Sequence, residues 1–227
     1  KLNSSPYIIE ELKKYLSKNN KINNEWNSLN ILSNNAATVG SYDLNILSSK
    51  NGTNNTLERI KKNEFEVLFL FGQENLKFKK DKEFIIYVGS HGDRGAEMAD
   101  IILPGASYTE QDGYFTNLEG KIQKAYQASY PPGEAKEDWK IINELSASLK
   151  RKYLYSDKDE LINSMLNYLN LYKDKKDFDV PIYEFVEEKI YIDDIDYYHS
   201  NAIARASKTM TECKNLKINI KKTGTDG

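Results

Sequence analysis

Three short apolar runs constrain the fold of this 227-residue chain more than any other feature. They are FEVLFLFG at 65–72, EFIIYVG at 83–89 and DIILPG at 100–105, and each ends at a glycine or includes a terminating Pro-Gly pair. Short runs rich in Val, Ile, Leu and Phe are typical of strands buried on both faces of a sheet. With helical patterns around them, they predict an α/β fold whose mainly parallel sheet is flanked by helices.

The segments around these runs carry weaker patterns. The sequence pattern predicts five helices. The first begins near residue 6, and the others cover Glu25 to about Val39, Thr56–Lys62, 134–150 and 158–172. Residues 113–130 predict an irregular β segment, and the asparagine-rich residues 45–55 predict a surface loop. We expect one α/β domain over 1–172 and an extended C-terminal tail over 173–227 that wraps over the domain or a neighbouring subunit.

The composition argues against several classes of protein. Charged residues make up 29% of the chain, yet the net charge is only −2 and lysines alternate with acids, so nothing predicts a nucleic-acid or anionic-membrane partner. No apolar run approaches the roughly 20 residues that cross a bilayer. Cys213 is the single cysteine, which excludes an internal disulfide and a cysteine-ligated cluster. Because the chain begins with lysine and has no recognisable targeting peptide, we expect it to be processed or incomplete.

A glycine-rich loop follows the second apolar run. Gly89, Gly92 and Gly95 could bring backbone N–H groups close to a phosphate at the start of a helix. Their G-x-x-G-x-x-G spacing differs from the dinucleotide fingerprint, however, and the Lys-Ser/Thr pair of a P-loop is missing. Tight turns with close packing are therefore the favoured interpretation, and a nucleotide loop is the alternative.

Two groups of polar residues invite a catalytic or metal-binding interpretation. His91 lies beside Asp93 and Arg94, and a carboxylate can orient a histidine base. No serine or cysteine nucleophile accompanies them, so a structural or interface role for His91 is favoured. Three acids further along could ligate a metal, but an Asp-Gly turn and a solvated loop explain them equally well; they are Glu110, Asp112 and Glu119.

Four motifs in order carry a family resemblance. GSHGDRGAEMADIILPGASYTEQDGYFTNLEGKIQ at 89–123 closely resembles a segment of the molybdopterin oxidoreductase superfamily, in the version found in the large iron–sulfur subunit of respiratory complex I, the NADH:quinone oxidoreductase. FEVLFLFGQEN at 65–75 resembles the preceding strand and loop. PPGEAKEDWKIINELS at 131–146 and SNAIARASKTMTEC at 200–213 resemble two later signatures. The resemblance runs from about Glu25 to Cys213.

The resemblance implies a fold and a set of partners. Since the clusters of that subunit belong to its cysteine-rich N-terminal part, it implies that this chain is the C-terminal part, without catalytic, cofactor-binding or metal-binding residues of its own. Iron–sulfur clusters and FMN are then expected in partner chains. Catalytic superfamily members bind a molybdenum or tungsten pterin through Cys, selenocysteine or Ser, and Cys213 lies in the tail signature. Lys121 stands where arginine is usual, which keeps the charge but loses the bidentate geometry.

Three functional hypotheses remain open. The favoured one is a noncatalytic structural and assembly part of the peripheral arm of complex I, at the matrix side of the mitochondrial inner membrane or the cytoplasmic face of a bacterial inner membrane. It would pack against the cluster-bearing N-terminal part of its subunit. The second is a fragment of a formate-dehydrogenase-like enzyme whose residues 89–97 contact the pterin. The third is a small nucleotide-binding protein that acts alone.

Overall fold

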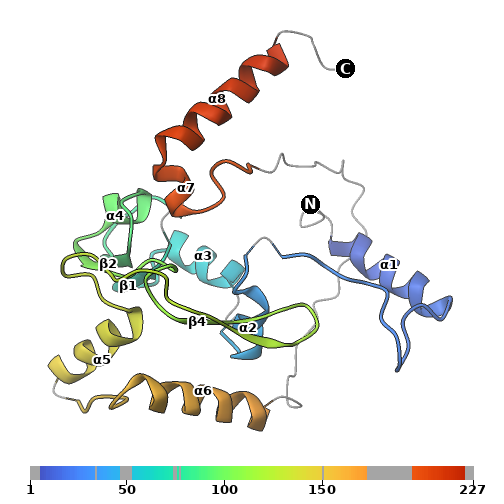
Figure 1. The fold of residues 1–227 in the computed structure, drawn as a ribbon, viewed down its shortest axis with the longest axis horizontal. Coiled ribbons are helices and arrows are strands. Elements are labelled where there is room, and N and C mark those ends of the chain that lie inside the picture. The colour runs from blue at the N-terminus through green and yellow to red at the C-terminus, as the bar shows by residue number, and fades with distance from the viewer. Residues whose placement is uncertain are drawn as a thin grey trace. The chain divides into compact units, whose positions relative to one another are not determined.

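The computed structural model describes residues 6–33, 35–46, 53–73, 76, 78–149, 151–172 and 196–222 (Figure 1). The chain forms two compact units, Asn30–Pro181 and a second made of Lys1–Leu29 with Ile182–Gly227. Residues 173–195, where the predicted tail begins, lie outside the described residues. The predicted domain division at residue 172 stays a prediction.

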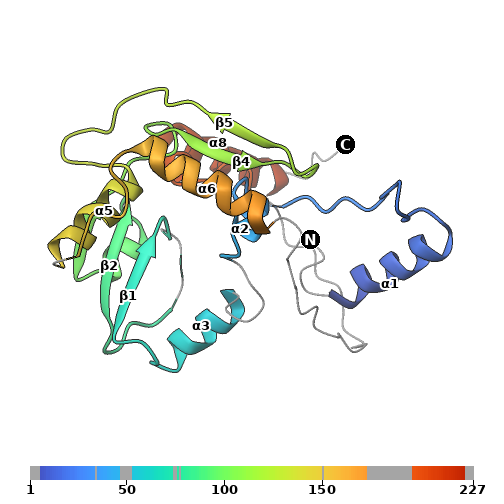
Figure 2. The ribbon, with the colours of Figure 1, turned by 90° about the horizontal axis from the view of Figure 1, so that it is seen from below.

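The larger unit is built on a three-stranded parallel sheet, as the apolar runs predict. Its strands are β1 (Val67–Phe71), β2 (Phe84–Gly89) and β3 (Ile101–Pro104), in the order β1-β2-β3. Figure 2 shows β1 and β2 running in the same direction. β2 is the central strand, and its residues Ile85, Tyr87 and Val88 are each no more than 1% exposed.

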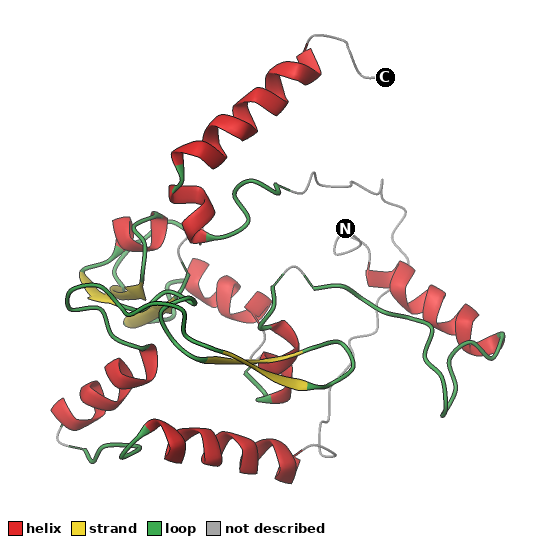
Figure 3. Cartoon of the chain, viewed as in Figure 1, coloured by secondary structure: helices red, strands yellow, loops and turns green. Residues whose placement is uncertain are grey.

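Helices complete the larger unit. They are α2 (Thr38–Asp43), α3 (Thr53–Lys61), α4 (Arg94–Met98), α5 (Asp138–Ser148) and α6 (Lys158–Tyr172). Figure 3 colours the helices red and the strands yellow. The core cluster of Leu70, Ile85 and Tyr87 packs against partly buried residues of α4 and the segment before β2. This arrangement confirms the predicted α/β class and the helices at 134–150 and 158–172.

An antiparallel hairpin follows the sheet. Its strands are β4 (Gly113–Thr116) and β5 (Ile122–Ala125), and the pairing runs from Gly113↔Ala125 to Thr116↔Ile122. α2 contacts β4, and a Cβ atom at Gly40 would lie 3.5 Å from the Thr116 hydroxyl. The predicted irregular β segment is thus a short, regular hairpin.

The helix predicted from Glu25 to about Val39 is wrong. Residues 26–33 have no helix, and Ile22 pairs with Asn27 in an isolated bridge. The cause is local, because the Asn23 side-chain oxygen accepts the N–H groups of Glu25 at 2.9 Å and Trp26 at 2.8 Å. Such asparagine side chains compete with helical hydrogen bonds. The helix instead begins at Thr38 and includes Gly40.

Two other boundaries differ from the prediction. α3 begins at Thr53, before the predicted start at Thr56, and residues 47–52 of the predicted loop lie outside the described residues. In the smaller unit, α1 (Pro6–Lys18) confirms the helix predicted from residue 6. The C-terminal segment contains two helices that the sequence analysis did not predict, α7 (Ala202–Ala206) and α8 (Lys208–Lys222). None of the described helices is long and apolar enough to span a membrane.

Candidate functional site

The glycine-rich loop joins β2 to α4 in the strand–turn–helix arrangement that the sequence predicts. Gly89 is the last residue of β2, and Asp93 caps α4 by accepting the Arg94 N–H at 2.9 Å. Asp93 has extended backbone geometry, which is usual for a helix N-cap. The carboxylate beside His91 therefore has a local structural role at the start of α4.

Tyr87 fills the space inside this loop. Its hydroxyl donates to the His91 carbonyl oxygen at 2.7 Å, and its ring is almost fully buried. A Cβ atom at Gly89 would overlap with the Tyr87 hydroxyl, and one at Gly95 would lie 3.0 Å from the ring and 2.5 Å from the Gln73 carbonyl oxygen. The absence of side chains at these glycines thus makes room for this chain's own atoms. The close-packing interpretation is confirmed for Gly89 and Gly95, whereas a Cβ atom at Gly92 would meet nothing within 4 Å.

His91 takes part in this packing through its backbone. Its side chain is only partly exposed, and Nδ1 lies 2.9 Å from the Ser90 hydroxyl. The Arg94 side chain is exposed. The contact with Tyr87 uses the backbone carbonyl of His91, so the structural or interface role of its imidazole stays a prediction.

Two of the three acids proposed as possible metal ligands make separate local contacts, and the third is exposed. Glu110 accepts the Ser107 N–H at 2.9 Å. Asp112 accepts the Gln127 N–H at 2.8 Å and pairs with Lys124 at 3.0 Å, and these two contacts, in that order, lower the pKa of Asp112. The Glu119 side chain is exposed in the hairpin turn. Within the described ranges, no three His, Cys, Asp or Glu residues are grouped to hold a metal ion.

The T-N-x-E-G stretch at 116–120 forms the turn of the β4–β5 hairpin. The Asn117 side-chain oxygen accepts the N–H groups of Glu119 at 3.0 Å and Lys121 at 2.9 Å. Gly120 donates its N–H to the Asn117 carbonyl oxygen at 3.0 Å and has φ +81°, a left-handed conformation that glycine adopts without strain. The Lys121 side chain is exposed. This motif specifies a turn.

Asp100, in the A-D-x-x-L-P stretch at 99–104, connects β3 to β2. Asp100 accepts the Ile85 N–H at 2.8 Å and the Lys80 ammonium at 2.7 Å, while its own N–H donates to the Ile85 carbonyl oxygen at 2.8 Å. The hydrogen bond from Ile85, followed by the one from Lys80, lowers the pKa of Asp100. Asp100 thus aligns the start of β3 with β2.

The Pro-Gly pair at the end of β3 contacts the segment around E-D-W at 137–139. Gly105 pairs with Lys136 in a parallel bridge, where the Lys136 N–H donates to the Pro104 carbonyl oxygen at 3.1 Å. A Cβ atom at Gly105 would lie 3.0 Å from the Asp138 carboxylate, and burial raises the pKa of Asp138. Glu137 forms ion pairs with Lys158 and Lys140. This motif fixes α5 beside the sheet.

A groove of about 500 Å³ lies between the end of β3 and α5. Its apolar lining includes Leu103, Ile141 and Leu145, and an ion pair of Lys136 with Glu144 at 2.7 Å lies among its lining residues. This lining can accept an apolar side chain and offers no set of groups arranged for catalysis.

The C-terminal signature specifies two consecutive helix caps. The Asn201 side chain accepts the Ala204 N–H at 2.9 Å at the start of α7. The Ser207 hydroxyl accepts the Met210 N–H at 3.3 Å at the start of α8, and the Thr211 hydroxyl donates back to the Ser207 carbonyl oxygen at 3.1 Å. Cys213 is a free, partly exposed thiol on α8. The capping residues Asn201 and Ser207 are the signal from which these helices could have been predicted.

Comparison with known proteins supplies the family. A sequence model described as molybdopterin oxidoreductase matches residues 5–148, which is more than half of the chain. The chain belongs to the molybdopterin oxidoreductase family. The match includes the sheet, the Tyr87 loop and α5, so the family's sequence pattern covers the parallel sheet and most of the motifs described above.

Three curated relatives are all named as subunits of an NADH-ubiquinone or NADH-quinone oxidoreductase. The chain is 36% identical to the NADH-ubiquinone oxidoreductase 75 kDa subunit of Reclinomonas americana, over 92% of the chain and 32% of that protein. It is 35% identical to an NADH-quinone oxidoreductase subunit of Rickettsia bellii, over 98% of the chain and 32% of that protein. It is 40% identical to the mitochondrial NADH-ubiquinone oxidoreductase 78 kDa subunit of Candida albicans, over 67% of the chain and 20% of that protein. The chain thus spans about a third of the length of the first two relatives.

Proposed function

We propose that this chain is a noncatalytic structural and assembly part of the peripheral arm of respiratory complex I, equivalent to the C-terminal part of its large iron–sulfur subunit. The similarity to the NADH-quinone oxidoreductase subunit of Rickettsia bellii over 98% of the chain carries this proposal. In this role, electrons pass from NADH to quinone through FMN and iron–sulfur clusters held by partner chains. The cluster-bearing part of the same subunit is the principal partner.

The packing of the Tyr87 loop supports a role without a cofactor of its own. In catalytic relatives, the resemblance implies a pterin that would contact residues 89–97. Here the glycine positions at 89 and 95 are filled by Tyr87 and the Gln73 carbonyl oxygen, and α4 is a short helix of five residues. The one cysteine lies on α8 in the C-terminal signature, and not in the loop at 89–97.

The location follows from the proposed role. The mitochondrial and bacterial relatives are named as subunits of NADH oxidoreductases of the ubiquinone or quinone type, which supports a membrane-associated complex. We propose the matrix side of the mitochondrial inner membrane, or the cytoplasmic face in a bacterium. Attachment to the membrane would then come from partner subunits.

Affinity isolation tests the role directly. The tagged chain is purified in mild detergent from the cells that produce it, and co-purifying proteins are identified by mass spectrometry. Iron, molybdenum and tungsten are measured in the same sample. The expected result is recovery of complex I subunits together with iron that these partners account for. Stoichiometric molybdenum or tungsten without those subunits contradicts the proposal and favours the formate-dehydrogenase-like alternative.

A further inference from the structure

The sheet has one apolar face that α4 does not cover. In the parallel register, Phe69 pairs with Ile86 and Ile86 with Ile101, so these side chains point to the same face. We call this surface the open face. It consists of Val67, Phe69, Phe71, Phe84, Ile86, Val88, Ile101 and Leu103. The opposite face carries Leu70, Ile85 and Tyr87 and packs against α4.

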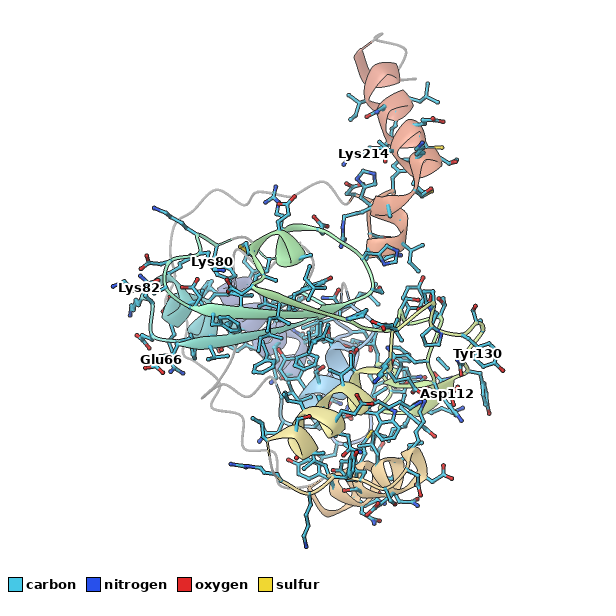
Figure 4. The ribbon with its side chains drawn as sticks, turned by 90° about the vertical axis from the view of Figure 1, so that its left-hand side faces the viewer. Glu66, Lys80, Lys82, Asp112, Tyr130 and Lys214 are labelled. Carbon is cyan, nitrogen blue, oxygen red and sulfur yellow. The ribbon has the colours of Figure 1, made fainter. Side chains whose placement is uncertain are left out.

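The described residues cover one end of the open face well and the other end poorly. Figure 4 shows α4 (green) and α5 (yellow) on opposite sides of the strands. At the carboxyl end, Val88 is 1% exposed and Leu103 shares the groove with Ile141 of α5. At the amino end the side chains reach solvent: Val67 is 51%, Phe84 43%, Ile101 43% and Phe69 39% exposed. α5 therefore protects one end of a surface that is apolar throughout.

Such a surface is unusual for an isolated parallel sheet. Parallel strands are normally covered on both faces, because their crossover connections place helices there. β1 is in addition an edge strand of five apolar residues, without the charge or proline that usually protects an edge. Charged residues stand just outside the strands, and Figure 4 labels Glu66 and Lys82 at this end of the sheet. An apolar centre with a charged rim is typical of a docking surface.

We propose that the open face docks the remaining part of the same subunit, through an amphipathic helix laid across Val67, Phe69, Phe84 and Ile101. This inference rests on the proposed function. The first two relatives have about two thirds of their length outside the region matched by this chain, which supplies a partner of sufficient size. A helix is the element that covers a sheet face in α/β folds.

The area of the open face argues against a second copy of the chain as the occupant. Four side chains that are 39–51% exposed present on the order of 300 Å² of apolar surface. A stable interface between separate proteins needs about 800 Å² on each partner. The open face therefore suits a contact within one larger subunit, whose other contacts supply the remaining area.

Ile101 and Ile102 offer a matched pair for the test. They are neighbours on β3, they are 43% and 55% exposed, and their side chains point to opposite faces. Tagged wild-type, Ile101→Lys and Ile102→Lys chains are produced in the native cells. Peptides from the remaining part of the subunit are quantified relative to the tagged chain. Because docking would bury the new charge, we expect Ile101→Lys to lower their recovery at least about tenfold, and Ile102→Lys to change it less than about twofold.

A milder variant separates docking from folding. Ile101→Thr keeps the β-branched shape but adds a hydroxyl, and we expect it to lower recovery in the same direction while the amount of soluble tagged chain stays unchanged. Equal recovery from all variants, with complex I subunits still present, overturns this inference and leaves the proposed function intact. Loss of those subunits from the wild type contradicts both. A concentration-dependent dimer of the purified chain that Ile101→Lys abolishes would identify a second copy as the occupant and overturn the inference.

Discussion

Tyr87 is the residue that most determines the structure of the loop after β2. Its ring occupies the space beside two glycines, and its hydroxyl holds the His91 carbonyl. A buried aromatic ring cannot move aside without disturbing the core cluster that it shares with Leu70 and Ile85. Packing against Tyr87 and the Gln73 carbonyl is therefore sufficient to explain why these two positions are glycines.

We predict that Gly89→Ala and Gly95→Ala each lower the free energy of unfolding by about 1–3 kcal/mol, because the added methyl group overpacks against Tyr87 or the Gln73 carbonyl. Gly92→Ala is the control, since a Cβ atom there meets nothing within 4 Å, and its effect should be below about 0.5 kcal/mol. Urea unfolding measures all three. Equal effects at the three positions contradict the packing argument.

The Asp100 carboxylate is the second residue with a testable local role. Its pKa is lowered by the Ile85 N–H and by Lys80, so its contribution to stability is present above the unfolded pKa near 3.8 and is lost as pH falls through the lower folded pKa. We predict that Asp100→Asn lowers the melting temperature at pH 7, and that this difference shrinks below about pH 4. Thermal unfolding at about pH 7 and about pH 3 measures it. A difference that is the same at both pH values contradicts the charge argument.

At the scale of the elements, one side chain connects α5 to the segment before α6. The Asn143 oxygen accepts the N–H groups of Leu154 at 2.6 Å and Tyr155 at 3.2 Å, and its amide donates to the Tyr155 carbonyl at 2.8 Å. Asn143 is only 8% exposed. Its three hydrogen bonds hold the backbone of Leu154 and Tyr155, which belong to no helix or strand.

We predict that Asn143→Ala lowers the free energy of unfolding by about 1–3 kcal/mol, because it removes three partly buried hydrogen bonds to the backbone of Leu154 and Tyr155. Asn143→Asp should retain part of the stability, since a carboxylate still accepts the two N–H groups but cannot donate to Tyr155. Asn163→Ala on the exposed side of α6 is the matched control, with an expected change below about 0.5 kcal/mol. Chemical denaturation of the three variants tests this order, and a loss at Asn163 as large as at Asn143 contradicts it.

At the scale of the whole molecule, the larger unit has its core mainly on one side of the sheet. Ile85 faces that core and is fully buried, whereas Ile101 faces the open side and is 43% exposed. We predict that Ile85→Ala lowers the free energy of unfolding of this chain by about 2–5 kcal/mol, and that Ile101→Ala lowers it by less than about 1 kcal/mol. Urea denaturation compares them. Similar losses would mean that the open face is already packed in this chain.

Within the complex, the two substitutions should change order. If the open face docks the rest of the subunit, Ile101 becomes buried there and its substitution weakens assembly without weakening the isolated chain. Stability and assembly would then depend on opposite faces of the same three strands.

The sequence by itself determined the three strands, their parallel pairing and most of the helices. Continuous apolar runs between helical patterns have few other stable arrangements, and this is why β1, β2, β3, α5 and α6 were predicted correctly. The same local information predicted that Gly89 and Gly95 lie in a tightly packed turn. It failed at 25–39, where asparagine side chains took the backbone N–H groups that a helix needs.

Only the tertiary structure decided what fills the glycine spaces and which face of the sheet stays open. In the sequence, Tyr87 is one more residue of an apolar run, and its contact with Gly95 and His91 depends on how β2, the loop and α4 close on each other. Likewise, the apolar residues of the strands carry no label for the face that α4 or α5 will cover. Register and helix placement sort them into core and open face, because these depend on contacts between segments far apart in the chain.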